Sequence, residues 1–84
     1  MRNNMLKQSE QYRKEIGVRI RTVRQKSGLS QTEFAKRVGC SQPSIVRFES
    51  GTRMPESYLV KMICEQFGCR IEWLVMGEGD SGLK

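Results

Sequence analysis

The chain of 84 residues contains no histidine and only three cysteines. Histidine and cysteine supply most zinc ligands, and a structural tetrahedral site needs four of them. The cysteines (Cys40, Cys64 and Cys69) cannot all pair within one chain, because their number is odd. We therefore interpret them as reduced core thiols of a protein from a reducing compartment, and we expect neither a bound metal nor a cofactor.

The sequence also lacks the marks of membrane, secreted and catalytic proteins. No apolar run approaches the roughly 18 residues that a transmembrane helix needs. No apolar segment follows the N-terminal MRNNMLKQ, so a secretory signal is not expected. There is no nucleophile–base arrangement and no phosphate-binding glycine loop, because the glycines are expected at helix ends. The prediction is a cytoplasmic protein that is not an enzyme.

Acidic side chains are scarce in the first part of the chain. The net charge is +6, from 15 Lys and Arg against 9 Asp and Glu. Residues 1–53 hold 12 of these cations and 4 of the anions, whereas residues 54–84 hold 3 and 5. A basic region favours a polyanionic partner, and nucleic acid is the usual one. Composition alone leaves solvated surface charge as an equal alternative.

The most informative stretch, residues 31–50 (QTEFAKRVGCSQPSIVRFES), has the pattern of two short helices. Ser30 and Glu33 have the spacing of a capping box, in which each side chain binds a backbone N–H at a helix N-terminus. Gly39 is expected to end this helix, because glycine enters the left-handed conformation without a Cβ clash. Three residues at helical spacing give the helix its apolar face: Phe34, Ala35 and Val38.

The second helix of the pair is expected over residues 42–49, with Ser41 as its cap. Ile45 and Phe48 are predicted to face inward. Two helices joined in this way form a helix-turn-helix, and the outer face of the second helix is the one that enters a DNA major groove. That outer face is predicted to carry Gln42, Ser44 and Arg47.

We predict an all-α fold, a compact five-helix bundle, because no segment shows convincing period-2 alternation. The first helix is expected at about residues 9–27, with an apolar stripe of Tyr12, Ile16, Ile20 and Val23. Pro55 suits the first turn of a fourth helix, where a missing N–H costs nothing. Gly68 should end that helix, and a short fifth helix should follow over residues 71–76.

These boundaries define a single domain over residues 9–77, with the helix-turn-helix motif at 31–50. Residues 1–8 are polar and are predicted to form a flexible basic tail. The glycine-rich, acidic residues 78–84 are predicted to be a disordered C-terminal tail.

The motif resembles the helix-turn-helix of the lambdoid phage repressor and Cro family, also called the xenobiotic-response-element (XRE) type. Ala35 matches the small residue that lets the two helices approach, and Gly39 matches the turn. Ile45 matches the branched residue that locks the second helix against the first. Flanking segments resemble the family in the right order, so the resemblance covers roughly residues 16–79.

The resemblance, together with side-chain chemistry, identifies candidate base contacts. The amide of Gln42 can donate and accept at once, which matches the N6 and N7 edge of adenine. Arg47 can bind O6 and N7 of guanine, or it can clamp a phosphate instead. Pro43 departs from the usual hydrogen-bonding residue and offers only apolar contact, such as to a thymine methyl. Ser44 is a further candidate for contact with a base or a phosphate.

Other residues are candidates for phosphate contact or for support. The resemblance implies that Gln31 touches a phosphate and braces Gln42, and that Arg24 ties the first helix to Glu49 while also reaching a phosphate. In the loop after the third helix an arginine of this family can follow the backbone or enter the minor groove. The remaining phosphate candidates are Ser41, which is expected mainly to cap, Ser50 and Arg53.

Relatives of this type use the C-terminal helix to build a dimer, which makes Trp73 and Leu74 candidates for the dimer interface. The alternative for Trp73 is a cap on the core of one protomer. The resemblance implies a sequence-specific transcriptional regulator, a repressor that binds a palindromic operator in double-stranded DNA as a dimer. Two alternatives stay open: an antitoxin that binds a toxin and controls its own operon, and the DNA-binding half of a larger repressor.

Overall fold

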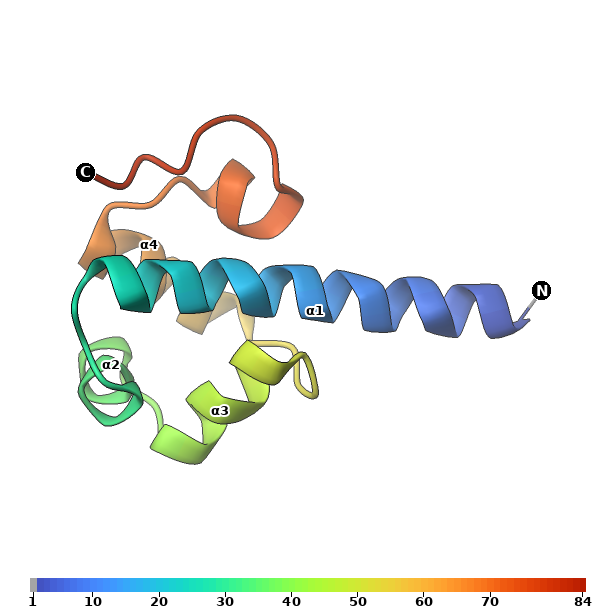
Figure 1. Cartoon of the computed structure of the whole chain (residues 1–84), viewed down its shortest axis with the longest axis horizontal. Helices are drawn as coiled ribbons and strands as arrows, with labels where there is room; N and C mark the ends of the chain where they lie inside the picture. Colours follow the sequence, from blue (N-terminus) through green and yellow to red (C-terminus); the bar gives the residue numbers. More distant parts are fainter. Residues whose placement is uncertain (1) are drawn as a thin grey trace.

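The computed structural model describes the backbone of residues 2–84 and the side chains of residues 8–84. These residues form an all-helical domain (Figure 1), which confirms the predicted fold class. The elements in chain order are α1 (Arg2–Lys26), α2 (Gln31–Val38), α3 (Gln42–Ser50), α4 (Ser57–Phe67) and a π-helical turn, η1 (Glu72–Met76).

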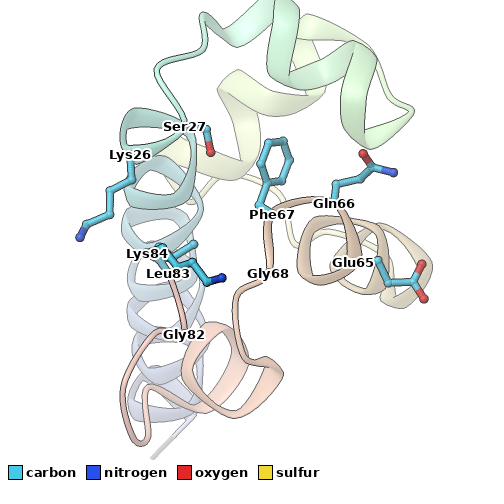
Figure 2. Close-up of a pocket in the computed structure, with 9 residues that line it drawn as sticks. All are labelled: Lys26, Ser27, Glu65, Gln66, Phe67, Gly68, Gly82, Leu83 and Lys84. Atoms are coloured by element: carbon cyan, nitrogen blue, oxygen red, sulfur yellow. The ribbon is translucent and has the colours of Figure 1, made fainter.

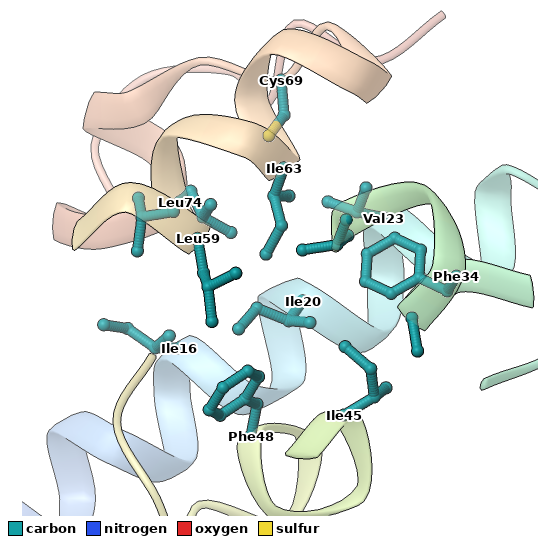
Figure 3. Packing of buried hydrophobic residues seen from close by; sticks show 13 residues of the cluster. Ile16, Ile20, Val23, Phe34, Ile45, Phe48, Leu59, Ile63, Cys69 and Leu74 are labelled. Carbon is teal, nitrogen blue, oxygen red and sulfur yellow. The ribbon is translucent and has the colours of Figure 1, made fainter. Parts of the chain in front are cut away.

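The helix α1 is the element on which the others assemble. In Figure 1 it runs along the long axis of the molecule, with α2 and α3 on one side and η1 with the C-terminal segment on the other. Its apolar stripe is buried between these elements (Figure 3), facing side chains of α2, α3, α4 and η1. The largest fully buried side chains are Phe34, Phe48, Ile16, Ile20, Ile45, Leu59, Ile63, Leu74, Val23 and Val38.

The start of α1 differs from the predicted one. The helix begins at Arg2 and not near Ser9, because the intervening residues include no glycine or proline to break it. Its N-terminal half projects beyond the other helices (Figure 1), so Tyr12 is 37% exposed and the buried stripe begins at Ile16. Although α1 has 25 residues, it is polar, and residues 2–84 include no helix apolar enough to cross a membrane.

The capping box predicted for α2 is present. The Ser30 hydroxyl accepts from the backbone N–H of Glu33 at 3.1 Å, and the Ser30 N–H donates to the Glu33 carboxylate at 2.9 Å. The backbone hydrogen bond lowers the pKa of Glu33. Gly39 ends the helix with φ of 96°, and its N–H donates to the carbonyl of Ala35 at 2.8 Å. The turn between α2 and α3 therefore requires the left-handed conformation that glycine adopts most easily.

Gly17 contradicts the expectation that the glycines lie at helix ends. It lies in the middle of α1, where the helix crosses the C-terminal end of α3. A Cβ at this position would come within 2.4 Å of the Phe48 carbonyl oxygen and 2.8 Å of the Glu49 carbonyl oxygen. The absence of a side chain therefore sets how closely the two helices pack.

The C-terminal part also differs from the prediction. Pro55 is buried but lies two residues before α4, because Glu56 takes the N-cap position. The segment after η1 is not helical, yet it folds back along the domain. The Arg70 N–H donates to the Ser81 carbonyl at 2.8 Å, and Leu83 packs against the core. Residues 78–84 were predicted to be disordered from their glycine-rich composition, which gave no weight to the single apolar residue Leu83.

All three cysteines are free thiols. Cys69 is buried, with its sulfur 3.6 Å from that of Cys64, while Cys40 and Cys64 are half-buried. Burial raises the pKa of Cys69 to about 12, so this residue remains a neutral thiol at physiological pH.

Candidate nucleic-acid interface

One face of α3 is turned away from the core. Pro43, Val46, Arg47 and Ser50 are exposed along it, at the spacing i, i+3, i+4 and i+7 that places side chains on one side of a helix. The structure therefore brings together two of the predicted base contacts, Pro43 and Arg47. Val46, which is 40% exposed, also lies on this face and was not among the predicted contacts. Its spacing from Pro43 and Arg47 could have revealed it.

Four polar side chains from three helices form one hydrogen-bonded series beside this face. Gln42 donates from Nε2 to Oε1 of Gln31 in α2, at 3.2 Å. Gln31 donates from its own Nε2 to Oε1 of Glu49, also at 3.2 Å. Arg24 of α1 completes the series with two bonds to the Glu49 carboxylate, at 2.6 and 3.1 Å. We call these four residues the polar relay.

Arg24 of α1 and Glu49 of α3 form an ion pair within the polar relay, between the two residues for which the resemblance implied one. The side chains of Arg24 and Glu49 are only 15% and 6% exposed. The hydrogen bond to Glu49 raises the pKa of Arg24, so its guanidinium stays charged. A third bond runs from Nη1 of Arg24 to the Leu29 carbonyl at 3.1 Å, which ties the loop before α2 to the same cation. The pair holds α1, the start of α2 and the end of α3 together.

Ser44 does not lie on the outer face, contrary to the prediction. It is 8% exposed, and its hydroxyl lies 2.9 Å from the hydroxyl of Ser41 and 3.0 Å from Nη1 of Arg53. Ser41 accepts the backbone N–H of Ser44 at 3.2 Å and caps α3, as expected. A base cannot reach Ser44 in this arrangement, because the helix turns the small hydroxyl toward partners inside the domain.

Arg53 is also turned toward the protein. Its guanidinium donates to Ser44 and to the Glu56 carboxylate, the latter at 2.5 Å, and it lies over the Phe48 ring at 5.2 Å. The phosphate contact by Arg53 stays a prediction, because the side chain is 41% exposed and its guanidinium has further N–H groups to donate. Ser50 remains exposed, with its hydroxyl 2.7 Å from that of Thr52, and so stays available at the end of α3.

The structure separates the two candidates for the dimer interface. Leu74 is 0% exposed and belongs to the core of the protomer, so its predicted role at the interface is wrong. Helical spacing in the short η1 did not reveal which side faces α1. Trp73 is half-buried and packs against the edge of the core, which leaves part of its ring accessible.

A pocket of about 480 Å³ lies elsewhere on the domain. Figure 2 shows it between the end of α1, the end of α4 and the last residues of the chain, with Lys26, Phe67 and Leu83 among its lining. None of the residues predicted to contact DNA lines it. The candidate interface is therefore the convex surface of α3 and not a cavity.

Residues 20–74 match the family model described as helix-turn-helix. The antitoxin PezA of Streptococcus pneumoniae is 40% identical over 52 residues, which make up 62% of this chain and 33% of PezA. The HTH-type transcriptional regulator for conjugative element R391 of Providencia rettgeri is 33% identical over 70 residues, 83% of this chain and 32% of that protein. The chain thus spans about a third of the length of these curated relatives.

A solved structure has the same architecture at the level of the whole domain. The P22 c2 repressor, crystallised in complex with a synthetic operator, superposes with a TM-score of 0.70 at 27% identity. The match covers 75% of this chain and 96% of the repressor chain. The remaining quarter of this chain is therefore additional to the matched repressor domain.

Proposed function

Because this chain belongs to the helix-turn-helix family, we propose that it is a sequence-specific transcriptional regulator that binds double-stranded DNA. It represses transcription by binding a palindromic operator as a dimer. The observation that carries the proposal is the exposed face of α3, which presents Pro43, Val46 and Arg47 beside the amide of Gln42. A helix exposed in this way, and backed by α1 and α2, has the form of a recognition helix for the major groove.

The chemistry of this face supports a division between affinity and specificity. Basic side chains predominate in residues 1–53, which hold 12 Lys and Arg against 4 Asp and Glu. Contacts from such side chains to phosphates supply affinity without regard to sequence, whereas base edges supply the discrimination. Arg47 and Gln42 carry the hydrogen bonds to bases, and the apolar Pro43 and Val46 suit thymine methyl groups.

The test is selection of bound duplexes from random DNA, followed by the mass of the complex with the selected site. We expect a two-fold symmetric sequence with half-sites about 34 Å apart, because a dimer places two recognition helices one turn of DNA apart. The complex should contain two protomers per duplex. A selected site without symmetry, bound by one protomer, would argue against the dimeric operator complex.

Gln42→Ala and Arg47→Ala are expected to leave the fold intact and to impair recognition. Each should relax discrimination at a separate base pair by about 1–3 kcal/mol, Gln42→Ala at an A·T pair and Arg47→Ala at a G·C pair. The measurement is binding of each variant to a panel of operators with single-base substitutions. If Arg47→Ala weakens every operator by the same factor, Arg47 is a phosphate clamp and does not read a base.

A matched control for this panel is Gln66→Ala, which removes an exposed glutamine amide from the end of α4. It should bind the whole panel as the parent protein does. Unchanged binding by all three variants would mean that α3 is not the recognition helix, and it would contradict the proposed function.

A second candidate function is supported by the match to PezA, an antitoxin, at 40% identity over 52 residues. In that case the protein binds a toxin in addition to its own operator. Expression together with the gene next to its own should then yield a stable complex of two different chains. Purification of the regulator alone, free of that neighbour, would favour the repressor without a toxin partner.

A further inference from the structure

We propose that Glu49 sets which base Gln42 prefers, acting through Gln31 as a positioning residue; this inference rests on the proposed function. Gln42 and Glu49 lie seven residues apart on α3, about 10 Å along the axis, so they do not touch. Gln31 of α2 spans the gap, with hydrogen bonds of 3.2 Å to each of them. The polar relay thus connects a residue inside the domain to an amide at the DNA-facing end of α3.

The charge on Glu49 determines the direction of both amides. An ionised carboxylate accepts hydrogen bonds and donates none, so Glu49 can be approached only by the NH₂ end of Gln31. This leaves the carbonyl oxygen of Gln31 facing Gln42, and a carbonyl oxygen also only accepts. Gln42 must therefore turn its own NH₂ group toward Gln31. The orientation of two amides, which is often a free choice, is here imposed by one charge.

Arg24 keeps that charge in place. The Glu49 side chain is 6% exposed, and an unpaired carboxylate at such a site would be strongly disfavoured. The two hydrogen bonds from Arg24 compensate for the lost hydration and hold the carboxylate in a fixed plane. The polar relay therefore starts at a fixed ion pair and ends at Gln42.

The consequence is a defined pattern of hydrogen-bonding groups on the free side of Gln42. Its Oε1 is left to accept, and its Nε2 retains one N–H to donate. An acceptor beside a donor complements N6 and N7 of adenine, whereas guanine offers two acceptors at O6 and N7. A reversed amide would direct both N–H groups outward and would suit guanine. Glu49 thus favours adenine over guanine at a base that it never contacts.

The decisive variant is Glu49→Gln, which keeps the shape of the side chain and removes its charge. Arg24 can only donate, and its shorter bond, 2.6 Å, goes to Oε2, whereas Gln31 binds Oε1. The oxygen of the new amide should therefore take the place of Oε2, which leaves the new NH₂ group facing Gln31. Both glutamines of the polar relay then reverse. The preference for adenine over guanine at this base pair, about 10-fold or more in the parent, should fall to within about 3-fold of unity or invert. The measurement is competition among four full operators that differ only at that base pair.

Two further variants separate this role from a loss of stability. Arg24→Lys breaks the two-bond ion pair but leaves Glu49 ionised, so it should weaken binding to all four operators alike and retain the ratio. Gln31→Met removes the link without a new charge, and it should reduce the adenine preference without inverting it. If circular dichroism shows that Glu49→Gln does not fold, the adenine preference of Gln31→Met decides whether the polar relay orients Gln42.

Retention of the full adenine preference in Gln31→Met, or in folded Glu49→Gln, would overturn the proposal. A failure of the proposed function looks different: Gln42→Ala would then leave the ratios among the four operators unchanged. If Gln42→Ala abolishes the preference while the two relay variants keep it, Gln42 reads the base but Glu49 does not position it.

Discussion

Replacing Gly17 with valine is expected to lower the free energy of unfolding by about 3 kcal/mol or more. The added Cβ would lie 2.4 Å from the Phe48 carbonyl oxygen, and the Glu49 carbonyl oxygen would be 2.8 Å away. Both are backbone atoms in a hydrogen-bonded helix, so they cannot move aside as a flexible side chain would. Carbon–oxygen contacts normally lie at about 3.3–3.6 Å, so α1 and α3 would have to separate by about 1 Å.

The free-energy cost of separating the two helices by this much outweighs the gain in helix propensity from replacing glycine. Glycine in a helix interior costs roughly 0.5–1 kcal/mol relative to alanine, which sets an upper limit on what a substitution can recover. The overpacking, by contrast, weakens the packing along the whole contact between α1 and α3, and it disturbs the ion pair of Arg24 with Glu49. Because about 1 kcal/mol shifts the melting temperature of a small domain by roughly 4–8 °C, a decrease of more than 10 °C is expected.

Thermal unfolding followed by circular dichroism measures this change. Gln25→Val is the matched control, because it places the same β-branched residue at an exposed position of the same helix. It should cost only about 0.5 kcal/mol, from propensity alone. A melting temperature of Gly17→Val close to that of Gln25→Val would mean that the two helices do not pack as closely as described.

Affinity for the operator is expected to fall by about 10³–10⁵-fold when the salt concentration rises from 50 to 200 mM, if the dimer makes six to ten phosphate contacts. The physical reason is the release of counterions from DNA when cations neutralise its phosphates. Residues 1–53 supply these cations, with 12 Lys and Arg against 4 Asp and Glu. A salt titration of binding to the selected operator gives the slope, about −0.9 for each contact.

Variants on opposite sides of the domain can show which surface makes the phosphate contacts that produce the salt slope. Arg70 is exposed and lies two residues before η1, which is on the opposite side of α1 from α3 (Figure 1), so Arg70→Ala should leave the slope unchanged. Arg47→Ala lowers it by about one for each protomer only if Arg47 clamps a phosphate. A slope near zero in the parent protein would contradict an interface that depends on phosphate contacts.

The helices of the motif could be read from the sequence because their signals are local. Ser30 and Glu33 bind backbone groups within the first turn of α2, and Gly39 has the positive φ that ends it. The start of α3 at Gln42 followed from Ser41 in the same way. Helix existence and caps depend on residues within four positions of one another, so a single sequence contains the information.

Local signals were insufficient at the ends of the chain. The extension of α1 to Arg2 and the packing of Leu83 on the core both conflict with predictions based on polar or glycine-rich composition. A single apolar residue in a polar segment is informative only when the surface that receives it is known.

The direction of individual side chains was decided by tertiary structure. Ser44 and Leu74 lie at the borders of apolar stripes, where periodicity does not settle which side is buried. Ser44 is buried beside Ser41 and Arg53, and Leu74 is buried in the core. Gly17 gave no sign of its role, since its partners are backbone atoms of a helix about thirty residues away in sequence. The sequence by itself determined the helix-turn-helix, and on the exposed face of α3 it placed Pro43 and Arg47 correctly but not Ser44 or Val46. The polar relay required the fold, because its hydrogen bonds join α1, α2 and both ends of α3, and only packing brings those elements together.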